Sequence, residues 1–197
     1  MENSLKQSLV TILLLAAVVI ATILLMMTGI RGIHALARAL INLGYIGAFL
    51  SGLLGTSSLM ISFFPPQIIV FLMSAPGLGF NPLIVGISAG LGAGIGQYLH
   101  YYVGAGGRFL VSEKRRRSME KWKAKINRYG PLLIFLFAVT PLTPDDLIWI
   151  PLGLMKYPKA KALMSAIAGK TVMLIVCAYG GHYGIELIEK YIVKWGG

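Results

Sequence analysis

The fold of this chain is decided by Val139-Thr-Pro-Leu-Thr-Pro-Asp-Asp-Leu-Ile-Trp-Ile150, in which two prolines and two adjacent carboxylates interrupt an apolar region. The flanking runs, Leu132 to Val139 and Leu147 to Met155, carry no charge, and neither reaches the roughly 20 residues that a helix needs to cross about 30 Å of hydrocarbon. One continuous span would place both carboxylates in lipid and would lose backbone hydrogen bonds at the prolines. We therefore predict a re-entrant hairpin of two half-helices, with its tip buried in protein or facing a water-filled cavity.

The composition is that of an integral membrane protein. Of the 197 residues, 56% are hydrophobic and 13% are charged, and this length indicates a single membrane domain, 1–197. The net charge is +11, but 9 of the 18 Lys and Arg residues lie within Arg108–Arg128, beside long apolar runs. This pattern is typical of a cytoplasmic membrane face and not of nucleic-acid binding. The one cysteine, Cys177, excludes an internal disulfide.

The N-terminal part is predicted to be a membrane anchor followed by a helix in the interface. Residues 7–30 are 24 uncharged residues without a small-residue cleavage pattern after them, so we expect a retained transmembrane helix. A short interfacial helix is expected from Arg31 to Asn42, because Ile33, Leu36 and Leu40 share one face.

A first broken hairpin is predicted around Phe63-Phe-Pro-Pro-Gln67, with Pro65 and Pro66 at its tip. The piece from Gln67 to Ala75 is too short to span, so we interpret this region as a second re-entrant pair. A full span is then expected from Leu83 to Val103. Its small residues recur every four positions, which lets helix backbones approach closely in lipid; these residues are Gly86, Gly90 and Gly94.

The second half begins with a basic interfacial helix, Ser112 to Arg128. We expect its arginines to contact anionic lipid headgroups; they are Arg108, Arg115, Arg116 and Arg117. After the hairpin, an apolar helix is predicted from Ala162 to about Tyr179, weakened beyond that point by Gly180, Gly181 and Gly184. An amphipathic segment, 182–197, would finish the chain at the membrane surface.

The second half repeats the first. The matching pairs are Ile33 with Met119 (119 − 33 = 86), Pro66 with Pro144 (144 − 66 = 78) and Gly90 with Gly169 (169 − 90 = 79). The units 31–107 and 108–181 each contain an interfacial helix, a broken hairpin and one full span. One span per unit makes the repeats inverted, which is a transporter architecture. The alternative is an accidental similarity between apolar sequences.

The second tip has the pattern of a helix start, with Thr143 as the cap, Pro144 at the first helical position and Asp146 three residues after the cap. Asp145 and Asp146 could serve only to satisfy the free amides of this helix end. The functional interpretation is that half-helix N-termini at both tips favour a phosphate group. Under it the site comprises the tip prolines Pro65, Pro66, Pro141 and Pro144 and the polar residues Gln67, Thr140, Thr143, Asp145, Asp146 and Lys170.

Lys170 is expected near the middle of its helix, where a lysine is unusual. It could extend to the interface, pair with Asp145 or Asp146, or bind a substrate phosphate. We find no metal-ligand spacing among His34, His100 and His182, and no nucleotide-binding or catalytic motif. The sequence therefore predicts no enzymatic activity, no metal and no cofactor.

The segment Phe137-Ala-Val-Thr-Pro-Leu-Thr-Pro-Asp-Asp-Leu-Ile-Trp-Ile-Pro-Leu-Gly-Leu154 resembles the second re-entrant loop of the DedA/VTT (SNARE-associated Golgi protein) family. The first loop of that family resembles Phe64-Pro-Pro-Gln67, and the Gly-Arg segment that follows it resembles Tyr102-Val-Gly-Ala-Gly-Gly-Arg108. The resemblance covers about Gly44 to Gly181. It departs from the family in two places. The arginine usual before the second loop is absent, and Gln67 stands nearest the position of the first loop's acidic residue.

The resemblance implies a lipid transporter or scramblase, since bacterial relatives are linked to recycling of polyprenyl-phosphate carriers and eukaryotic relatives to phospholipid scrambling. We therefore expect a multi-pass cell-membrane protein that moves a lipid with a phosphate headgroup between the two re-entrant loops, with proton coupling and a homo-oligomeric state left open. The alternative is a non-transporting membrane scaffold that binds a partner or anionic lipid through its basic cytoplasmic segment.

Overall fold

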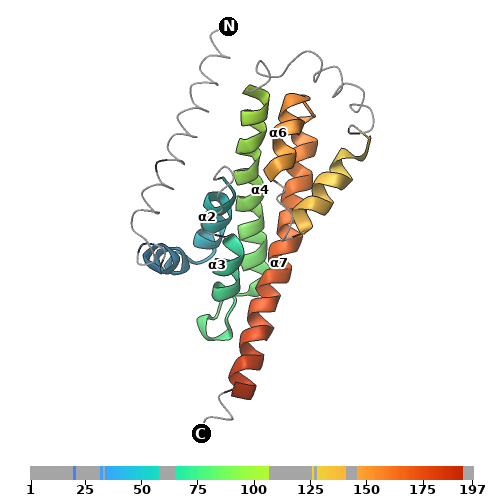
Figure 1. The fold of residues 1–197 in the computed structure, drawn as a ribbon. Helices are drawn as coiled ribbons and strands as arrows, with labels where there is room; N and C mark the ends of the chain where they lie inside the picture. The colour runs from blue at the N-terminus through green and yellow to red at the C-terminus, as the bar shows by residue number, and fades with distance from the viewer. Residues whose placement is uncertain are drawn as a thin grey trace.

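The computed structural model is helical throughout the part that it describes, which comprises residues 20, 32, 34–57, 65–106, 126, 128–140 and 146–192 (Figure 1). The predicted all-α class is confirmed for these residues, which contain no strand. Most of the predicted N-terminal span, most of the basic segment, the tip of the second hairpin and the residues just before Pro65 of the first tip lie outside the described residues. The chain ends at Gly197, and the description stops at Ile192.

The described part of the first half consists of three short α-helices, one 3-10 turn and one long helix. In order these are a helix over 34–42, α2 (Gly44–Ser57), α3 (Pro66–Met73), the 3-10 turn η1 (Pro76–Leu78) and α4 (Pro82–Gly106). Pro66 stands at the first position of α3, where a proline costs no hydrogen bond. The 8 residues of α3 extend about 12 Å, so α3 cannot cross a membrane. This length agrees with the short segment predicted from Gln67 to Ala75.

The α4 helix begins at a cap that the sequence analysis did not single out. The Oδ1 atom of Asn81 accepts hydrogen bonds from the amides of Leu83 (2.9 Å) and Ile84 (3.4 Å). Pro82, which follows Asn81, is the first residue of the helix. The amide of Asn81 in turn donates to the hydroxyl of Tyr45 on α2 (3.1 Å). This contact fixes the start of α4 against the start of α2.

The described part of the second half contains two short helices and one long one. They are a helix over Arg128–Val139, α6 (Asp146–Leu154) and α7 (Lys159–Ile192). The two predicted half-helices around the deciding stretch are thus both present, and Thr140 lies outside the helical part. The 9 residues of α6 extend about 14 Å, again too short to cross.

A defined turn reverses the chain between α6 and α7. The amide of Tyr157 donates to the carbonyl of Leu152 (3.0 Å), and the amide of Lys156 donates to the carbonyl of Gly153 (3.1 Å). Lys156 takes the left-handed conformation, with φ 53°, which completes a Schellman motif. Tyr157 and Leu152 are both buried, as this motif favours, so the start of α7 is held beside the end of α6.

The two long helices α4 and α7 lie side by side in opposite directions (Figure 1). Their backbones approach at glycines of α4 that recur every four residues, as predicted, because no side chain separates them. The contacts pair Gly86 with Ile175, Gly90 with Thr171 and Gly94 with Ile167. Along these three contacts the residue numbers rise on α4 and fall on α7, so the two helices are antiparallel.

Glycines also seat the shorter helices on the long ones. Gly92 and Gly96 of α4 lie against the backbone of α2. Gly104 of α4 receives Ile150 of α6, and Gly181 of α7 receives Phe71 of α3. Each short helix after a predicted tip therefore contacts the long helix of the other half.

The predicted end of the last apolar helix near Tyr179 is wrong. α7 is one helix of 34 residues that continues through Gly180, Gly181 and Gly184 to Ile192. The physical reason is the contact of Gly181, since a Cβ there would lie 2.4 Å from the carbonyl oxygen of Phe71. This glycine is required for packing and not for a helix end.

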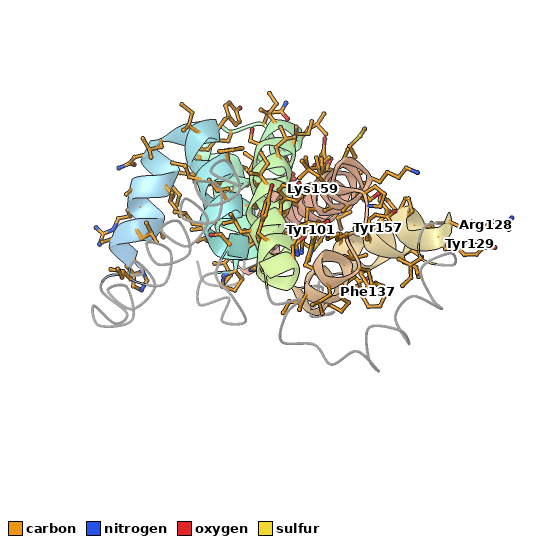
Figure 2. All side chains as sticks on the ribbon, turned by 90° about the horizontal axis from the view of Figure 1, so that it is seen from above. Tyr101, Arg128, Tyr129, Phe137, Tyr157 and Lys159 are labelled. Carbon is orange, nitrogen blue, oxygen red and sulfur yellow. The ribbon has the colours of Figure 1, made fainter. Side chains whose placement is uncertain are left out.

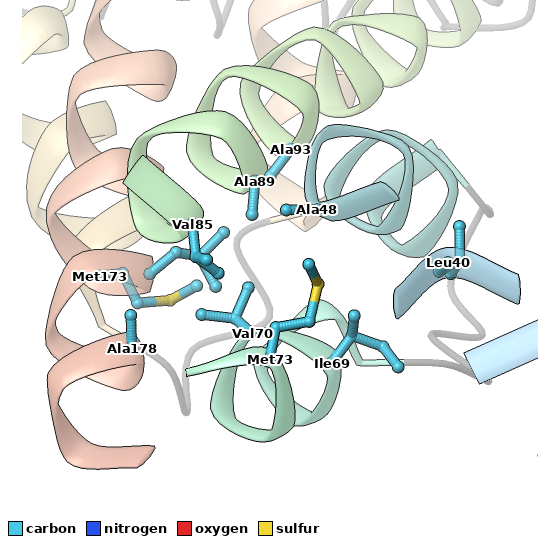
Figure 3. Close-up of a cluster of buried hydrophobic side chains, with 11 residues drawn as sticks. Leu40, Ala48, Ile69, Val70, Met73, Val85, Ala89, Ala93, Met173 and Ala178 are labelled. Carbon is cyan, nitrogen blue, oxygen red and sulfur yellow. The ribbon is translucent and has the colours of Figure 1, made fainter. Parts of the chain in front are cut away.

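Buried apolar side chains form two separate clusters. The first apolar cluster (Figure 3) comprises Leu40, Ala48, Ile69, Val70, Met73, Val85, Ala89, Ala93, Met173, Leu174 and Ala178. The second apolar cluster comprises Tyr101, Ile134, Trp149, Leu152, Tyr157, Ala162 and Ala166. α4 and α7 contribute to both, whereas α2 and α3 contribute only to the first and α6 only to the second.

The outer faces of the long helices are apolar. On α4, Leu83, Ile87, Leu91 and Ile95 are exposed at a spacing of four residues. The described residues bury 50% of the apolar part of α4 and 39% of that of α7, and the rest of both faces outward. These two helices are the candidate membrane spans among the described residues, and they cover Pro82–Tyr102 and Lys159–Leu187.

Candidate functional site

On each long helix, a buried polar residue separates the part that contributes to the first apolar cluster from the part that contributes to the second. On α4, Gln97 follows Ala93 of the first cluster by four residues and precedes Tyr101 of the second by four. On α7, Lys170 lies in the same way between Ala166 and Leu174. Residues four apart share a helix face, so each long helix passes from one cluster to the other at a polar side chain. Gln97 is 1% exposed and Lys170 is 5% exposed.

The end of α2 lies beside the part of α4 between Ala93 and Gln97. α2 leaves the first cluster and finishes with two buried polar residues, Thr56 and Ser57, while α3 enters the cluster just after Gln67. The hydroxyl of Thr56 donates within 2.8 Å of both the carbonyl of Gly52 and the carbonyl of Ala93 on α4. These contacts hold the end of α2 against α4.

Gln67 keeps its place among the predicted site residues. It lies in the first turn of α3, after Pro65 at the cap and Pro66 at the first helical position. Its Oε1 atom is buried and accepts no hydrogen bond from the part of the chain that is described. The Oγ1 atom of Thr171 on α7 is in the same situation. Buried oxygens of this kind are costly unless a donor reaches them.

The two helices of the second hairpin pack in the second apolar cluster, and the residues between them lead to Thr140 and Asp146. The helix over Arg128–Val139 ends before Thr140, whose exposed hydroxyl donates to the carbonyl of Leu136 (2.8 Å). α6 starts at Asp146 and enters the second cluster three residues later at Trp149.

We call the polar residues that separate the two clusters along the helices the polar layer. They are spread along the bundle, because the contact of Gly90 with Thr171 places Lys170 beside residue 91 of α4, six residues before Gln97. Thr140 is exposed and the others are buried or half-buried; the layer consists of Thr56, Ser57, Gln67, Gln97, His100, Thr140, Lys170 and Thr171.

Lys170 does not extend to the surface. Its neighbour Gly169 packs against the helix over Arg128–Val139, where a Cβ would lie 2.6 Å from the Cβ of Ala138. Lys170 therefore lies one residue from a tight contact with the helix that leads to Thr140. Its burial argues against the interpretation of Lys170 as a lysine that reaches the interface.

Several predicted site residues lie outside the described residues. These are Pro141, Thr143, Pro144 and Asp145 of the second tip and Arg108, Arg115, Arg116 and Arg117 of the basic segment. Asp146 is described only as the first residue of α6, without its side chain. The predicted cap and headgroup contacts at these positions stay predictions.

Five members of the polar layer were missed by sequence reasoning as site residues: Thr56, Ser57, Thr171 and, on α4, Gln97 and His100. Gln97 and His100 are both 1% exposed. Their signal in the sequence is weak, because a single amide or imidazole in an apolar helix does not reveal which neighbour it meets. The usable sign is the spacing of Gln97, which continues the small-residue face of α4 from Ala93.

Aromatic and basic residues mark the end of the bundle where α7 begins. The ammonium of Lys159 lies 4.8 Å from the ring centroid of Tyr102 and 6.0 Å from that of Tyr101 (Figure 2). The hydroxyl of Tyr101 donates to the carbonyl of Tyr157 (2.8 Å), and burial raises the pKa of Tyr157. Arg128 lies 5.4 Å from the ring of Tyr129, at the outer end of its helix. This end therefore has the character of a membrane–water interface.

Comparison with known proteins identifies the chain from its sequence. The family model of the VTT domain matches residues 64–183, which is more than half of the chain. The chain belongs to the VTT-domain family. The matched part contains α3, α4, α6 and most of α7. It therefore includes Gln67, Gln97, His100, Thr140, Lys170 and Thr171 of the polar layer. VTT-domain proteins are in general membrane proteins proposed as transporters, which confirms the predicted family and, at this level, its functional class.

Searches among curated proteins and solved structures gave no match to the VTT-domain chain. Within its described residues, no group of three His, Cys, Asp or Glu side chains is placed to hold a metal ion. The chemistry available to the VTT domain in the polar layer is hydrogen bonding and charge from amides, hydroxyls, an imidazole and an ammonium.

Proposed function

We propose that this VTT-domain protein moves a lipid with a phosphate headgroup, a polyprenyl phosphate or a phospholipid, across the membrane through the polar layer. The observation that carries the proposal is the buried polar layer between two apolar clusters, in a bundle whose long helices have apolar outer faces. A phosphate group is far too polar to cross hydrocarbon unassisted, and a polar layer at mid-height lowers that barrier. The proposal requires no enzymatic step and no cofactor.

The contacts between the two halves support an inverted repeat. In the first half α3 docks on α7 at Gly181, and in the second half α6 docks on α4 at Gly104. The offset of 79 that relates Gly90 to Gly169 maps position 181 onto position 102 (181 − 79 = 102), two residues from Gly104. In an inverted repeat, each short helix packs on the long helix of the other half, and both predicted tips would lie near the middle of the membrane. Alternating-access transporters have this arrangement.

The short helices also explain why an anionic headgroup is favoured. Both α3, which starts at Pro66, and α6, which starts at Asp146, present an N-terminus to the interior of the chain's predicted hairpins, and helix N-termini carry unpaired amides and a partial positive charge. Lys170 adds a full positive charge between the clusters. Asp145 and Asp146 would then control access of the headgroup to these groups, a role that we assign from the sequence.

Reconstitution into vesicles tests the proposal directly. Fluorescent phosphatidylglycerol, phosphatidylcholine, a polyprenyl phosphate and a ceramide, which lacks phosphate, are placed in separate vesicle preparations, and loss of fluorescence to an impermeant quencher reports their movement between leaflets. We expect protein-dependent movement of at least one phosphate lipid and none of ceramide. If no phosphate lipid moves faster than in protein-free vesicles, the scaffold alternative replaces transport.

Topology provides a second test. We propose that Arg108–Arg128 and the lysines at the start of α7 share the cytoplasmic face, because a hairpin that does not cross returns the chain to the same side. Single cysteines at Ser118 and Lys159, in a Cys177→Ser background, should react equally with a membrane-impermeant reagent in oriented vesicles. Labelling of the two positions from opposite sides would mean that the second hairpin crosses the membrane.

A further inference from the structure

The two candidate spans meet one end of the bundle at Tyr102, the last residue of the first span, and at Lys159, the first residue of the second. The packing of α4 on α7 makes these two residues neighbours. Gly94 of α4 contacts Ile167 of α7. Tyr102 lies eight residues after that glycine (102 − 94 = 8), and Lys159 lies eight residues before that isoleucine (167 − 159 = 8). In an antiparallel pair of helices, equal steps of this kind lead to the same height.

The side chains at this height are in contact. The ammonium of Lys159 lies 4.8 Å from the ring centroid of Tyr102 and 6.0 Å from that of Tyr101 (Figure 2). A cation is attracted to an aromatic ring within about 6 Å of its centroid. We call Tyr101, Tyr102 and Lys159 the aromatic–lysine corner.

The backbone around the corner is fixed by hydrogen bonds. Tyr101 is buried, and its hydroxyl donates to the carbonyl of Tyr157 (2.8 Å), two residues before Lys159. The turn at Lys156 sets the direction in which α7 starts. Lys159 itself is exposed, but the rings already restrict its ammonium. Less conformational entropy therefore remains to be lost when a ligand binds to this lysine.

The corner carries positive charge, and its two long helices place no carboxylate beside it. α4 contains no Asp or Glu, and the chain contains none from Leu147 to Ile185. Lys156, Lys159 and Lys161 are all exposed at this end of the bundle. An ammonium has three N–H donors, and those of Lys159 that point away from the rings are available to an anion from outside the chain.

We propose that the aromatic–lysine corner binds the phosphate of an anionic phospholipid in the leaflet that it faces. Lysine binds phosphate as a compact positive charge, and tyrosines at the end of a span lie at the height of the lipid headgroups. The inference goes beyond the proposed function, because binding here requires no movement of the lipid between leaflets and uses no residue of the polar layer.

The same geometry disfavours choline lipids. A quaternary ammonium group binds to the faces of aromatic rings, but at this corner the ammonium of Lys159 already lies over the rings and repels a second cation. A choline lipid therefore gains little from the tyrosines. Phosphatidylglycerol has the same phosphate and no competing cation, so the corner should select it.

Photochemical cross-linking measures the position and the affinity of the lipid together. Phosphatidylglycerol with a photoreactive group beside its phosphate is titrated onto the purified full chain in nonionic detergent, and the modified residues are mapped by mass spectrometry. We expect cross-links at the end of α4 and the start of α7. Unlabelled phosphatidylglycerol should displace the probe at a concentration about tenfold lower than phosphatidylcholine with the same acyl chains, because it keeps a charged hydrogen bond without a competing cation.

Four variants separate a built site from general attraction by positive charge. Lys159→Gln should weaken cross-linking at the corner about tenfold, since a charged donor is lost. Lys161→Gln makes the same change at an exposed lysine of the same helix and should stay within about twofold of the wild type. Tyr102→Leu should weaken cross-linking about two- to fivefold, the factor that a cation–π contact contributes at an exposed site, whereas Tyr102→Phe keeps the ring and should bind normally.

The outcomes decide the inference independently of transport. Equal losses in Lys159→Gln and Lys161→Gln would overturn it, as would cross-links elsewhere on the chain or equal displacement by the two lipids. If Lys159→Gln fails to fold, the two Tyr102 variants decide, and equal binding by them overturns the site. Cross-linking in the expected pattern without lipid movement in vesicles refutes only the transporter. Transport by a protein that shows no cross-link at the corner refutes only the corner.

Discussion

Replacement of Gly90 by alanine is expected to lower the free energy of unfolding by about 3 kcal/mol, at the upper end of what one extra methyl group costs in a tightly packed interior. A Cβ at Gly90 would lie 2.4 Å from the Cα atom of Thr171, so the backbones of α4 and α7 would have to separate. The loss should be visible as a shift of the denaturation midpoint in detergent micelles.

Gly180 provides the matched control for this prediction. It lies inside α7, it is exposed, and a Cβ there would meet no atom within 4 Å. Gly180→Ala should therefore stabilise the protein by about 0.5–1 kcal/mol, because alanine loses less backbone entropy than glycine in a helix. Equal destabilisation by the two alanines would contradict the close crossing of α4 and α7.

Replacement of Lys170 by methionine is expected to reduce lipid transport by about 10- to 100-fold while leaving a folded protein. Methionine keeps most of the length of the buried side chain and removes its charge, and a hydrogen bond to a charged group contributes about 1.5–3 kcal/mol. Transport is measured with the most rapidly moved phosphate lipid. Lys161→Met, at an exposed position of the same helix, should transport normally.

Folding measurements on the same variants distinguish a substrate contact from a structural ion pair. If Lys170 serves only to pair with a buried carboxylate, Lys170→Met should lower the free energy of unfolding by about 3–5 kcal/mol, and neutralising the partner should restore stability. The double variant Asp145→Asn, Asp146→Asn is the complementary test. Asparagine caps helices nearly as well as aspartate, so this variant should fold, and normal transport by it would remove both aspartates from the site.

Much of the fold follows from local rules that act within a few residues. The two half-helices around the deciding stretch, the helix that starts at Pro66 and the span of α4 were all predicted, because proline positions and uninterrupted apolar length determine them. The small-residue spacing of α4 predicted a close helix contact, although it did not name α7 as the partner. The end of the last helix was predicted wrongly, since its glycines were attributed to a break and one of them is needed to receive α3.

The candidate site was only partly predictable for the same reason. Gln67 and Lys170 stood out as polar residues next to a tip or inside an apolar helix, and both lie in the polar layer. Gln97 and His100 did not stand out in the sequence. Their position becomes informative only when the structure shows that α4 enters the first apolar cluster before them and the second after them. A residue on one helix is buried by residues on another helix that is distant in the sequence. The sequence of the first helix alone therefore does not show which of its residues are buried.

The sequence by itself determined that this protein is helical, that its apolar runs are broken at two proline-containing places, and that it belongs with the VTT-domain proteins. These properties depend on composition and on short-range constraints of the backbone. Only the tertiary structure decided that α3 docks on α7 and α6 on α4, and that Gln97 and Lys170 each separate two apolar clusters on their helices. The reason is that helix packing is set by the joint shape of two surfaces, which a linear pattern of residues does not specify.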